Sequence, residues 1–448
     1  SPEVGARAPS GVRRGAHSLG AHNLGSVARV AATSRVEAAK PANGPWQLVV
    51  FELTELTSLV SDRRLFDDVS AAAGVARAEG LVDYSMPPAN GLLFEYANNG
   101  MTSVADVDND GLMDFLVTSM GTKSVLYRNT GSGFEAWRPE GGDPLLAPAW
   151  GGLFFDHDND GDSDYFFVDV ATDTPRLLVN QLVPSGTLSF TAGWHHDQAI
   201  ARPDIAALNA FSGAVAADIN RDQIPDVLVL LWASTGPPNN VNGATNGSPN
   251  LLFVSQPDGT YVEAAERWGV AGHHFSHAAQ FVDLDQDGLL DVYVVNDFSG
   301  GNFLLRNAGD HFEDITAKSG LRDRGWAMGV TFGDVDNDGD LDVHVSRMSS
   351  TVGARVLALL DERDVPDYEQ LEFIGDGNKV YENRGDGTFV ERANLYASWS
   401  YGGGFVDLDG SGVGAAVGAG DEGGDGGAAV GGDAVFDFDA GPDGVVGD

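Results

Sequence analysis

The chain of 448 residues has no cysteine, which excludes a disulfide framework, thiol catalysis and cysteine-based zinc sites. Basic residues are also scarce: 26 Lys and Arg stand against 66 Asp and Glu, and the formal net charge is −40. So acidic a surface repels nucleic acid and anionic membranes, and we expect neither as a partner. The sequence lacks any apolar run long enough for a membrane span.

Known catalytic signatures are missing as well. The sequence has no nucleophile elbow, P-loop, dinucleotide fingerprint or H-E-x-x-H motif. Acidic residues occur throughout, so a pair of carboxylates carries no hydrolase signal here. We therefore predict that the protein is not an enzyme. An enzyme with an unrecognised central pocket is the less favoured alternative.

The most informative pattern is an acidic loop of nine residues that occurs five times. We name the copies loops 1 to 5 and number the positions in each from 1 to 9. They read DVDNDGLMD (Asp106–Asp114), DHDNDGDSD (Asp156–Asp164), DINRDQIPD (Asp218–Asp226), DLDQDGLLD (Asp283–Asp291) and DVDNDGDLD (Asp334–Asp342). A damaged sixth copy, DLDGSGVGA, begins at Asp407.

This spacing predicts a calcium site in each loop, because calcium prefers six to eight oxygen ligands. Positions 1, 3, 5 and 9 supply side-chain oxygens, position 7 supplies its carbonyl, and glycine at position 6 allows the chain to reverse. The predicted ligand positions are Asp106, Asp108, Asp110, Leu112 and Asp114; Asp156, Asp158, Asp160, Asp162 and Asp164; Asp218, Asn220, Asp222, Ile224 and Asp226; Asp283, Asp285, Asp287, Leu289 and Asp291; and Asp334, Asp336, Asp338, Asp340 and Asp342. Magnesium and zinc fit these ligands less well.

The copies are not equal. Loop 3 has Asn220 at position 3 and Gln223 in place of glycine, so we expect it to bind calcium most weakly of the five. The sixth copy has Ser411 at position 5 and Ala415 at position 9, and we expect it to be empty or very weak. Ordinary surface turns do not explain five copies in matched register. EF-hands are rejected, because the segments after the loops are β-branched and aromatic and indicate strands.

The spacing of the loops indicates the fold. Loop starts are separated by 50, 62, 65, 51 and 73 residues, a period typical of propellers or solenoids. In each module a short apolar strand leads into the loop and a second strand follows it. A third strand carries a Leu/Tyr-Asn motif such as SVLYRN, and a fourth strand carries Phe or Tyr. We therefore predict an all-β propeller of four-stranded antiparallel blades, with the calcium loops between the first two strands of each blade.

The predicted organisation has three parts. Residues 1–45 form an N-terminal tail or linker, residues 46–410 the propeller, and residues 411–448 an acidic, glycine-rich tail that can contribute to the last blade. The segment FDDVSAAAGV (66–75) resembles the ends of later modules, and it indicates a blade without a loop before loop 1. We predict seven blades, with six as the alternative.

These residues resemble FG-GAP/VCBS repeats, the blades of integrin α-subunit propellers. The resemblance is closest to the cartilage acidic protein/ASPIC-UnbV group, in text such as VYVVNDFSGGNFLLRNAGDHFEDITAKSGL (292–321) and SWSYGGGFVDLDGSG (398–412). It covers roughly residues 62–410. It implies a calcium-binding propeller, usually exported, that acts by binding and not by catalysis. A further C-terminal domain common in that group has no counterpart in the tail after Ser411.

Three smaller motifs have both a functional and a structural interpretation. Arg384-Gly385-Asp386 spells an integrin-recognition tripeptide, but we expect it to be the turn between a third and a fourth strand. A histidine cluster (His195, His196, His273, His274 and His277) suggests zinc only weakly. Four tryptophans near module boundaries (Trp150, Trp268, Trp326 and Trp399) fit packing between blades, with stacking on sugar rings as the alternative.

The leading functional hypothesis is a calcium-stabilised propeller that serves as a binding or adhesion platform for protein or extracellular-matrix partners. A lectin-like propeller that binds glycans is the alternative. Extracellular calcium modules bind at about 10⁻⁴–10⁻³ M and would be mostly empty in cytosol. We therefore expect a secreted, cell-surface or periplasmic protein, with an organelle lumen as a further option.

Overall fold

The structure is a computed structural model in which side chains and backbone are described for 70–75, 101–119, 123–197, 211–232, 244–297, 301–321, 323, 325–348 and 377–392 with few exceptions. Strands alone are described in the terminal regions, over 13–23, 26–39, 47–61, 393–395, 399–406, 415–421 and 434–437. The chain divides into two compact units, residues 1–69 and 70–448. No helix in the described part of the chain is long and apolar enough to cross a membrane.

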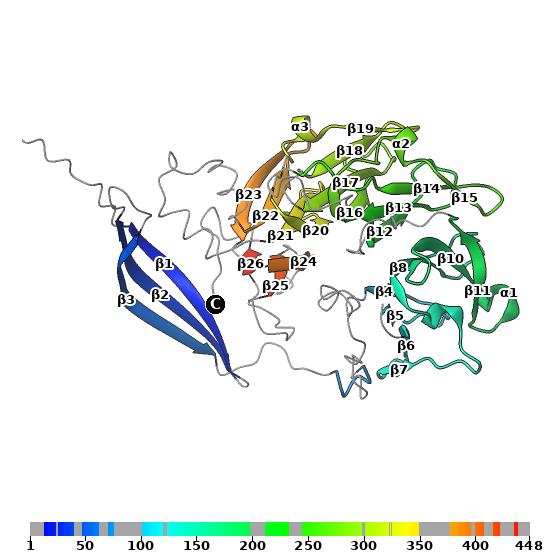
Figure 1. Ribbon diagram of the computed structural model, residues 1–448, viewed down its shortest axis with the longest axis horizontal. Helices are drawn as coiled ribbons and strands as arrows, with labels where there is room; N and C mark the ends of the chain where they lie inside the picture. Colours follow the sequence, from blue (N-terminus) through cyan, green and yellow to red (C-terminus); the bar gives the residue numbers. More distant parts are fainter. Residues whose placement is uncertain are drawn as a thin grey trace, which may run out of the picture. The chain divides into compact units, whose positions relative to one another are not determined.

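The first unit contains one antiparallel sheet of long strands, coloured blue in Figure 1. Its strands are β1 (Arg13–Asn23), β2 (Ser26–Ala39) and β3 (Gln47–Ser61), in the order β1-β2-β3. The apolar run WQLVVFEL, expected in the propeller, therefore pairs with a strand from the predicted N-terminal tail. The boundary between the two units falls between residues 69 and 70, whereas the sequence suggested one between residues 45 and 46.

The second unit contains five four-stranded antiparallel sheets, which we number 1 to 5 like their loops. Sheet 1 comprises β4 (Thr102–Ala105), β5 (Asp114–Val117), β6 (Val125–Asn129) and β7 (Phe134–Ala136). Sheet 2 comprises β8 (Ala149–Phe155), β9 (Asp164–Asp169), β10 (Thr174–Asn180) and β11 (Phe190–His195). Sheet 3 comprises β12 (Phe211–Ala217), β13 (Asp226–Leu231), β14 (Leu251–Ser255) and β15 (Tyr261–Glu263).

Sheets 4 and 5 repeat this pattern. Sheet 4 comprises β16 (Phe275–Val282), β17 (Asp291–Asp297), β18 (Phe303–Asn307) and β19 (Phe312–Asp314). Sheet 5 comprises β20 (Ala327–Gly333), β21 (Asp342–Arg347), β22 (Asn378–Asn383) and β23 (Phe389–Leu395). The first strand of each sheet contacts the first strand of the next, from β4 through β20. The predicted all-β fold of four-stranded, blade-like sheets is confirmed.

A sixth sheet follows, with the order β24-β25-β26. Its strands are β24 (Trp399–Val406), β25 (Ala415–Asp421) and β26 (Ala434–Asp437), and β24 contacts β20. Two of these strands lie in the acidic, glycine-rich tail, so this part of the tail forms sheet. The damaged sixth loop, which begins at Asp407, lies outside the described residues.

Every acidic loop has the same register. The residue before position 1 pairs with the residue at position 9, as in Ala105↔Asp114 and Gly333↔Asp342. The second strand therefore begins at position 9 in all five sheets, where an EF-hand would have its helix. Val406 pairs with Ala415 in the sixth sheet, so that hairpin keeps the register without the acid.

The apolar core lies between consecutive sheets and not within one closed centre. Four clusters of buried side chains fill the interfaces between sheets 1 and 2, 2 and 3, 3 and 4, and 4 and 5. Alternate strand residues point to opposite faces, so a strand such as β13, whose residues are all buried, contributes to two clusters. Face-to-face packing of this kind is expected of propeller blades.

Short helical elements follow some strands: η1 (Pro144–Leu146), α1 (Leu182–Ser185), α2 (Ala265–Trp268) and α3 (Thr316–Ser319). The helices α2 and α3 each end at a glycine in the left-handed conformation, which lies against the fourth strand of the next sheet. A Cβ on Gly269 would lie 3.2 Å from the carbonyl oxygen of Phe312, and one on Gly320 would lie 2.7 Å from that of Phe389. Positive φ and close approach together favour glycine at both positions.

The segment 70–75 makes the same contact with sheet 1. A Cβ on Gly74 would lie 2.2 Å from the carbonyl oxygen of Phe134, and Phe134 N–H donates to the carbonyl of Ala73 at 2.7 Å. The resemblance of FDDVSAAAGV to later module ends therefore extends to its packing. Residues 76–100 lie outside the described part of the chain, and the number of blades stays a prediction.

Candidate metal centres

Position 1 folds each loop around its own carboxylate. In loops 1, 2, 3 and 5 one oxygen of this aspartate accepts the N–H of position 5 at 3.0–3.2 Å, and in all five loops the other accepts the N–H of position 6 at 2.7–3.1 Å. Each carboxylate oxygen retains a second lone pair. Position 1 is thus a loop-forming residue that is still able to ligate a cation.

Positions 4 and 6 provide the reversal. Position 6 has a φ of 74° to 95°, and it is glycine except in loop 3, where Gln223 adopts the same conformation. A non-glycine residue in this region costs of order 1 kcal/mol, so loop 3 is strained where the other loops are not. Position 4 also has positive φ in every loop, between 56° and 63°. The sequence pattern gave no signal for position 4.

Position 9 fastens the loop to the sheet. One oxygen of Asp114 accepts the N–H of Val107 at 3.2 Å and the other accepts the N–H of Asn129 at 2.7 Å. The same pair of bonds, from position 2 and from the last residue of the third strand, recurs at Asp164, Asp226, Asp291 and Asp342. Position 9 is therefore a buried staple that joins the loop, the second strand and the third strand, as well as a predicted ligand.

Burial of this staple changes its acidity. Loss of hydration, reinforced by nearby acids and only partly offset by the two backbone N–H groups, raises the pKa of Asp226, Asp291 and Asp342 to about 6 each. The pKa of Asp114 is raised for the same reason. A buried carboxylate among other carboxylates lacks a compensating positive charge, and a bound cation would supply it.

The asparagine at the end of the third strand is a structural residue whose role the loop pattern alone does not reveal. Its side-chain amide donates to the carbonyl of position 8, as Asn129 does to Met113 at 3.2 Å and Asn383 to Leu341 at 3.2 Å. In sheet 3 Ser255 replaces it and donates to Asp226. The recurrent Asn in SVLYRN, NFLLRN and KVYENR was the available signal.

The loops bring predicted ligands together. Ligand oxygens lie within 4.8 Å of one another in four sets confined to carboxylates, of which three are Asp106, Asp108 and Asp114; Asp156, Asp158 and Asp160; and Asp283, Asp285 and Asp287. Asp334, Asp336 and Asp342 form a fourth. Loop 3 contributes no such group among the described residues.

Three buried carboxylate oxygens in these loops fit cation ligands. Asp108 Oδ1, Asp162 Oδ1 and Asp283 Oδ1 have no hydrogen-bond partner among the described residues. A buried, unpaired acceptor costs about 1–3 kcal/mol or more when charged, and a hard cation would satisfy it. The donor set is oxygen throughout loops 1, 4 and 5, which suits calcium and not zinc.

Loop 2 adds a histidine to its acids. His157 Nδ1, at position 2, lies 2.7 Å from Asp164 Oδ2 and is within reach of Asp158. Burial alone would lower the pKa of His157, but the hydrogen bond and charge of Asp164, with Asp158 and Asp156, raise it. In loops 1, 3 and 5 position 2 is apolar and fully buried, so it serves as an anchor in the core.

The residue before the third-strand asparagine reaches position 3 in two loops. Arg128 forms an ion pair with Asp108 in loop 1, and Arg306 Nε lies 2.9 Å from Asp285 Oδ2 in loop 4. The equivalent residue in sheet 5 is Glu382. Burial raises the pKa of Asp336 most, the charge of Asp338 raises it next, and the charge of Glu382 raises it further. Loops with the same acids therefore differ in local charge.

The smaller motifs are placed as follows. His277 Nδ1 lies 2.9 Å from the carbonyl oxygen of Met328, and His274 packs on Phe303 with ring centroids 4.5 Å apart. The described histidines form no group of three without carboxylates. Arg384-Gly385-Asp386 is the turn between β22 and β23, closed by a bond from Arg384 N–H to the carbonyl of Thr388 at 3.0 Å.

The tryptophan positions favour packing. Trp268 is 4% exposed in the core between sheets 3 and 4 and contacts Phe312, and Trp150 packs against the core between sheets 2 and 3 while its Nε1–H donates to Asp173. Neither presents a free ring for a sugar. The side chain of Trp399 lies outside the described residues.

One cavity lies between sheets 3 and 4, with a volume of about 170 Å³. Three of its polar groups bond to each other: Asn250 donates to Ser276 Oγ at 2.9 Å, and Ser276 donates to Asn296 at 2.9 Å. His274 Nδ1 also lines the cavity and has no hydrogen-bond partner among the described residues. Ligand pockets are usually about 300–1,000 Å³. The cavity is therefore small for a glycan or a metabolite.

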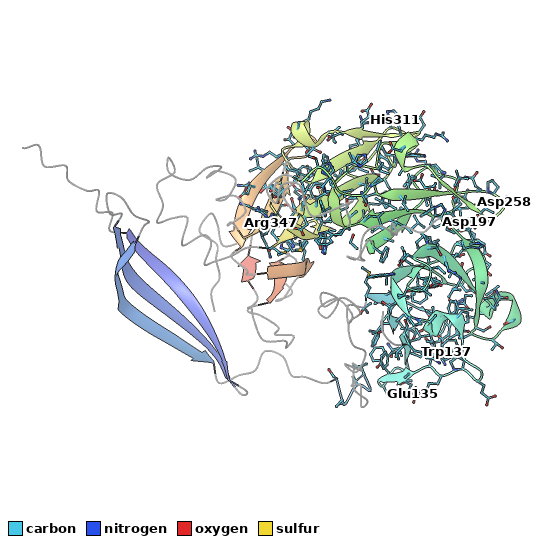
Figure 2. The ribbon with its side chains drawn as sticks, in the orientation of Figure 1. Glu135, Trp137, Asp197, Asp258, His311 and Arg347 are labelled. Carbon is cyan, nitrogen blue, oxygen red and sulfur yellow. The ribbon has the colours of Figure 1, made fainter. Side chains whose placement is uncertain are left out.

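A buried charged cluster lies in sheet 5, where Figure 2 labels Arg347. Arg347 and Asp323 are fully buried, with Nε and Oδ1 3.7 Å apart, and Tyr381 donates to Asp323 at 3.4 Å. Gly325 packs directly against the guanidinium, where a Cβ would clash. By contrast, Asp258 and His311 lie in exposed turns between third and fourth strands (Figure 2).

Comparison with known proteins identifies the repeat. The family described as "FG-GAP-like repeat" matches residues 106–167 and 283–345, which contain loops 1, 2, 4 and 5. No curated protein matches the chain. Similar solved structures include BBS1N in complex with ARL6DN, with TM-score 0.42, 9% identity, and coverage of 71% of this chain and 75% of that one. The S. cerevisiae core factor has TM-score 0.35 and 9% identity, covering 90% of this chain and 57% of that one.

Each matched segment begins at position 1 of one loop, Asp106 or Asp283, and ends within the second strand of the next module, so it contains two loops and the strands between them. Those segments have the geometry described above: a first strand, a loop stapled at position 9 and a buried second strand. The sheets that contain them are four-stranded and antiparallel. The chain therefore carries FG-GAP-like repeats on an all-β array of propeller-type blades.

Proposed function

We propose that this protein is a calcium-stabilised, exported propeller that acts as a binding platform for a protein or extracellular-matrix partner. The observation that carries the calcium assignment is the set of carboxylate groups in loops 1, 2, 4 and 5, with buried oxygens that lack partners. Asp106, Asp156, Asp283 and Asp334 would hold the ion with the acids at positions 3, 5 and 9 of their loops. A bound cation would neutralise acids that otherwise repel one another.

The proposed location follows from affinity. Sites that bind at about 10⁻⁴–10⁻³ M add roughly 0.4–1.4 kcal/mol each at about 1 mM calcium. Five such sites approach the net stability of a domain, which is about 5–15 kcal/mol. Cations would therefore hold the sheets together outside the cell, where calcium is at this level.

Binding is favoured over catalysis by the arrangement of the polar groups. The acids gather in loops that suit cations, and the cavity between sheets 3 and 4 is small. The packing of Trp268 and Trp150 gives the lectin hypothesis no specific support. The turns between strands leave a large surface for a macromolecular partner.

The test is a thermal melt in 1 mM calcium against excess EGTA, compared with about 1 mM magnesium. We expect calcium to raise the melting temperature by many degrees and magnesium to raise it much less. Asp287→Ala should reduce the calcium effect. Asp310→Ala, an exposed acid of the same sheet outside the loop, is the matched control and should leave it unchanged. No calcium shift in the wild type would overturn the proposal.

The partner class is tested with the folded protein immobilised in calcium. Capture of matrix proteins that is lost in EGTA supports the platform. Recognition on a glycan array without protein capture would favour the lectin alternative.

A further inference from the structure

The acidic loops are joined to one another by position 4, a residue outside the predicted ligand set. Asn109 Nδ2, in loop 1, donates to the carbonyl of Gly161 in loop 2 at 2.9 Å. Asn159 Nδ2, in loop 2, donates to the carbonyl of Gln223 in loop 3 at 2.8 Å. In both cases the acceptor is position 6 of the next loop.

The link from loop 3 to loop 4 is the strongest. Arg221 Nε donates to the carbonyl of Gly288 at 3.1 Å, and Arg221 Nη2 donates to the carbonyl of Asp287 at 2.7 Å. A Cβ on Gly288 would lie 2.5 Å from Nη2, so the glycine leaves room for the guanidinium. From loop 4, Gln286 Nε2 lies 3.5 Å from Asp340 Oδ1 at position 7 of loop 5, a weaker contact.

Positive φ explains the direction of these links. Each of the four donors has a φ between 56° and 63°. Asparagine adopts this conformation readily, but arginine and glutamine adopt it only at a cost in free energy. A strained backbone at Arg221 and Gln286 is compensated by the bond that each makes to its neighbour.

A second set of links runs back between the same loops. Asn180 Nδ2, at the end of the third strand of sheet 2, donates to the carbonyl of Val107 in loop 1 at 3.0 Å. Asn307 Nδ2, in sheet 4, donates to the carbonyl of Ile219 in loop 3 at 2.9 Å. Both bonds are buried, and each acceptor is position 2, next to the position 9 staple of its loop.

We infer that loops 1 to 5 form one linked belt, in which position 4 of each loop holds the ligand-bearing segment of the next and makes cation binding in neighbouring loops positively coupled. Arg221 is the central positioning residue of this belt. Its acceptors are the carbonyls of positions 5 and 6, which directly precede the carbonyl predicted to ligate at position 7. An ion that orders loop 3 therefore orders the donor for loop 4, and the effect is reciprocal.

This inference rests on the proposed function, since it concerns how calcium sites communicate. It goes beyond that function because separate loops would bind calcium independently. Loop 3, with the poorest ligand set, gains a role as a connector: it receives Asn159 from loop 2 and extends Arg221 to loop 4.

The experiment follows hydrogen exchange of peptides that cover loop 4 (283–291) as free calcium is raised, which gives the local binding midpoint. Four proteins form a double-mutant cycle: wild type, Asp222→Ala to weaken loop 3, Arg221→Ala, and both together. Arg267→Ala removes an exposed charge from helix α2, which follows sheet 3 and lies outside any loop, and is the matched control. Melts in EGTA verify that each variant folds.

We expect Asp222→Ala to raise the loop 4 midpoint about 5-fold or more when Arg221 is present and less than about 2-fold when it is absent. Arg267→Ala should leave the midpoint unchanged. Equal shifts from Asp222→Ala in both backgrounds, or an unchanged midpoint, would overturn the belt while leaving calcium binding intact. If loop 4 of the wild type gains no protection from calcium, the proposed function fails and the belt with it.

Discussion

Loops 3 and 5 share a backbone but differ in charge. Both are stapled at position 9, where Asp226 and Asp342 each accept two backbone N–H groups. Loop 5 has aspartate at all five odd positions, and loop 3 has Asn220 and Ile224 instead at two of them. Asn220 Nδ2 donates to Asp222 Oδ2 at 3.0 Å, so a neutral amide stands where loop 5 has a carboxylate. The comparison teaches that folding the loop and binding a cation depend on different residues.

The largest expected effect comes from removing the position 9 aspartate, which loops 3 and 5 share. Asp226→Ala and Asp342→Ala each leave two backbone N–H groups without acceptors, at sites that are almost fully buried. We expect each to lower the free energy of unfolding by about 2–4 kcal/mol, in EGTA as well as in calcium. Chemical denaturation measures it, with exposed Asp310→Ala as control. A cost present only in calcium would mean that position 9 acts as a ligand alone.

A reciprocal exchange at position 3 sharpens the difference. Asp336→Asn gives loop 5 the amide of loop 3, and Asn220→Asp gives loop 3 the acid of loop 5. We expect the first to reduce, and the second to increase, the stabilisation by 1 mM calcium by up to about 1.4 kcal/mol, with little change in EGTA. Melts in both buffers measure this. The hypothesis fails if both substitutions change stability equally with and without calcium.

The third-strand charge gives a smaller effect. Arg306 pairs with Asp285 and Asp287 of loop 4, whereas Glu382 lies at the equivalent position beside loop 5. We expect Arg306→Ala to raise the calcium affinity of loop 4 about 3- to 10-fold, because one competing charge is removed. Glu382→Ala should lower that of loop 5 by a similar factor. Titration of each variant against Arg267→Ala tests this, and an opposite sign at either loop would contradict it.

Stability should also depend on pH, in opposite directions with and without calcium. Burial raises the pKa of Asp226, Asp291 and Asp342 to about 6, above the ordinary value of 3.8, so the folded protein holds more protons than the unfolded chain between these values. In metal-free buffer, stability should therefore rise as pH falls from 7 to about 5. In calcium the trend should reverse, since protons displace the ion. Melts across this range, in buffer passed over a chelating resin, decide between the two signs.

Much of the second unit was predictable from sequence. The regular acids fixed where first strands end and second strands begin, because position 9 always opens a strand. Third strands were marked by their asparagines, and fourth strands by an aromatic residue such as Phe312. These signals are local, so they do not depend on how the sheets pack.

What escaped prediction depends on contacts between distant residues. Nothing in the loop pattern distinguishes Asn109 or Arg221 from any variable residue, because their partners lie 52 and about 66 residues away in another loop. The pairing of β2 with β3 was not predicted. The alanine- and arginine-rich sequence of β2 is a weak strand signal, whereas the sequence of β3 is a strong one. The two backbone bonds of position 9 were hidden by its resemblance to a simple ligand.

The glycine contacts between successive sheets also bear on solubility. The fourth strand is the outer strand of each four-stranded sheet, and an outer strand offers unpaired backbone groups to any other chain. In residues 70–75, the carbonyl of Ala73 accepts the backbone N–H of Phe134 in such an outer strand. The glycines that end α2 and α3 lie against the backbone carbonyls of Phe312 and Phe389. In sheets 1, 4 and 5 the preceding segment thus covers part of the edge strand. Edge strands covered in this way discourage edge-to-edge aggregation between chains.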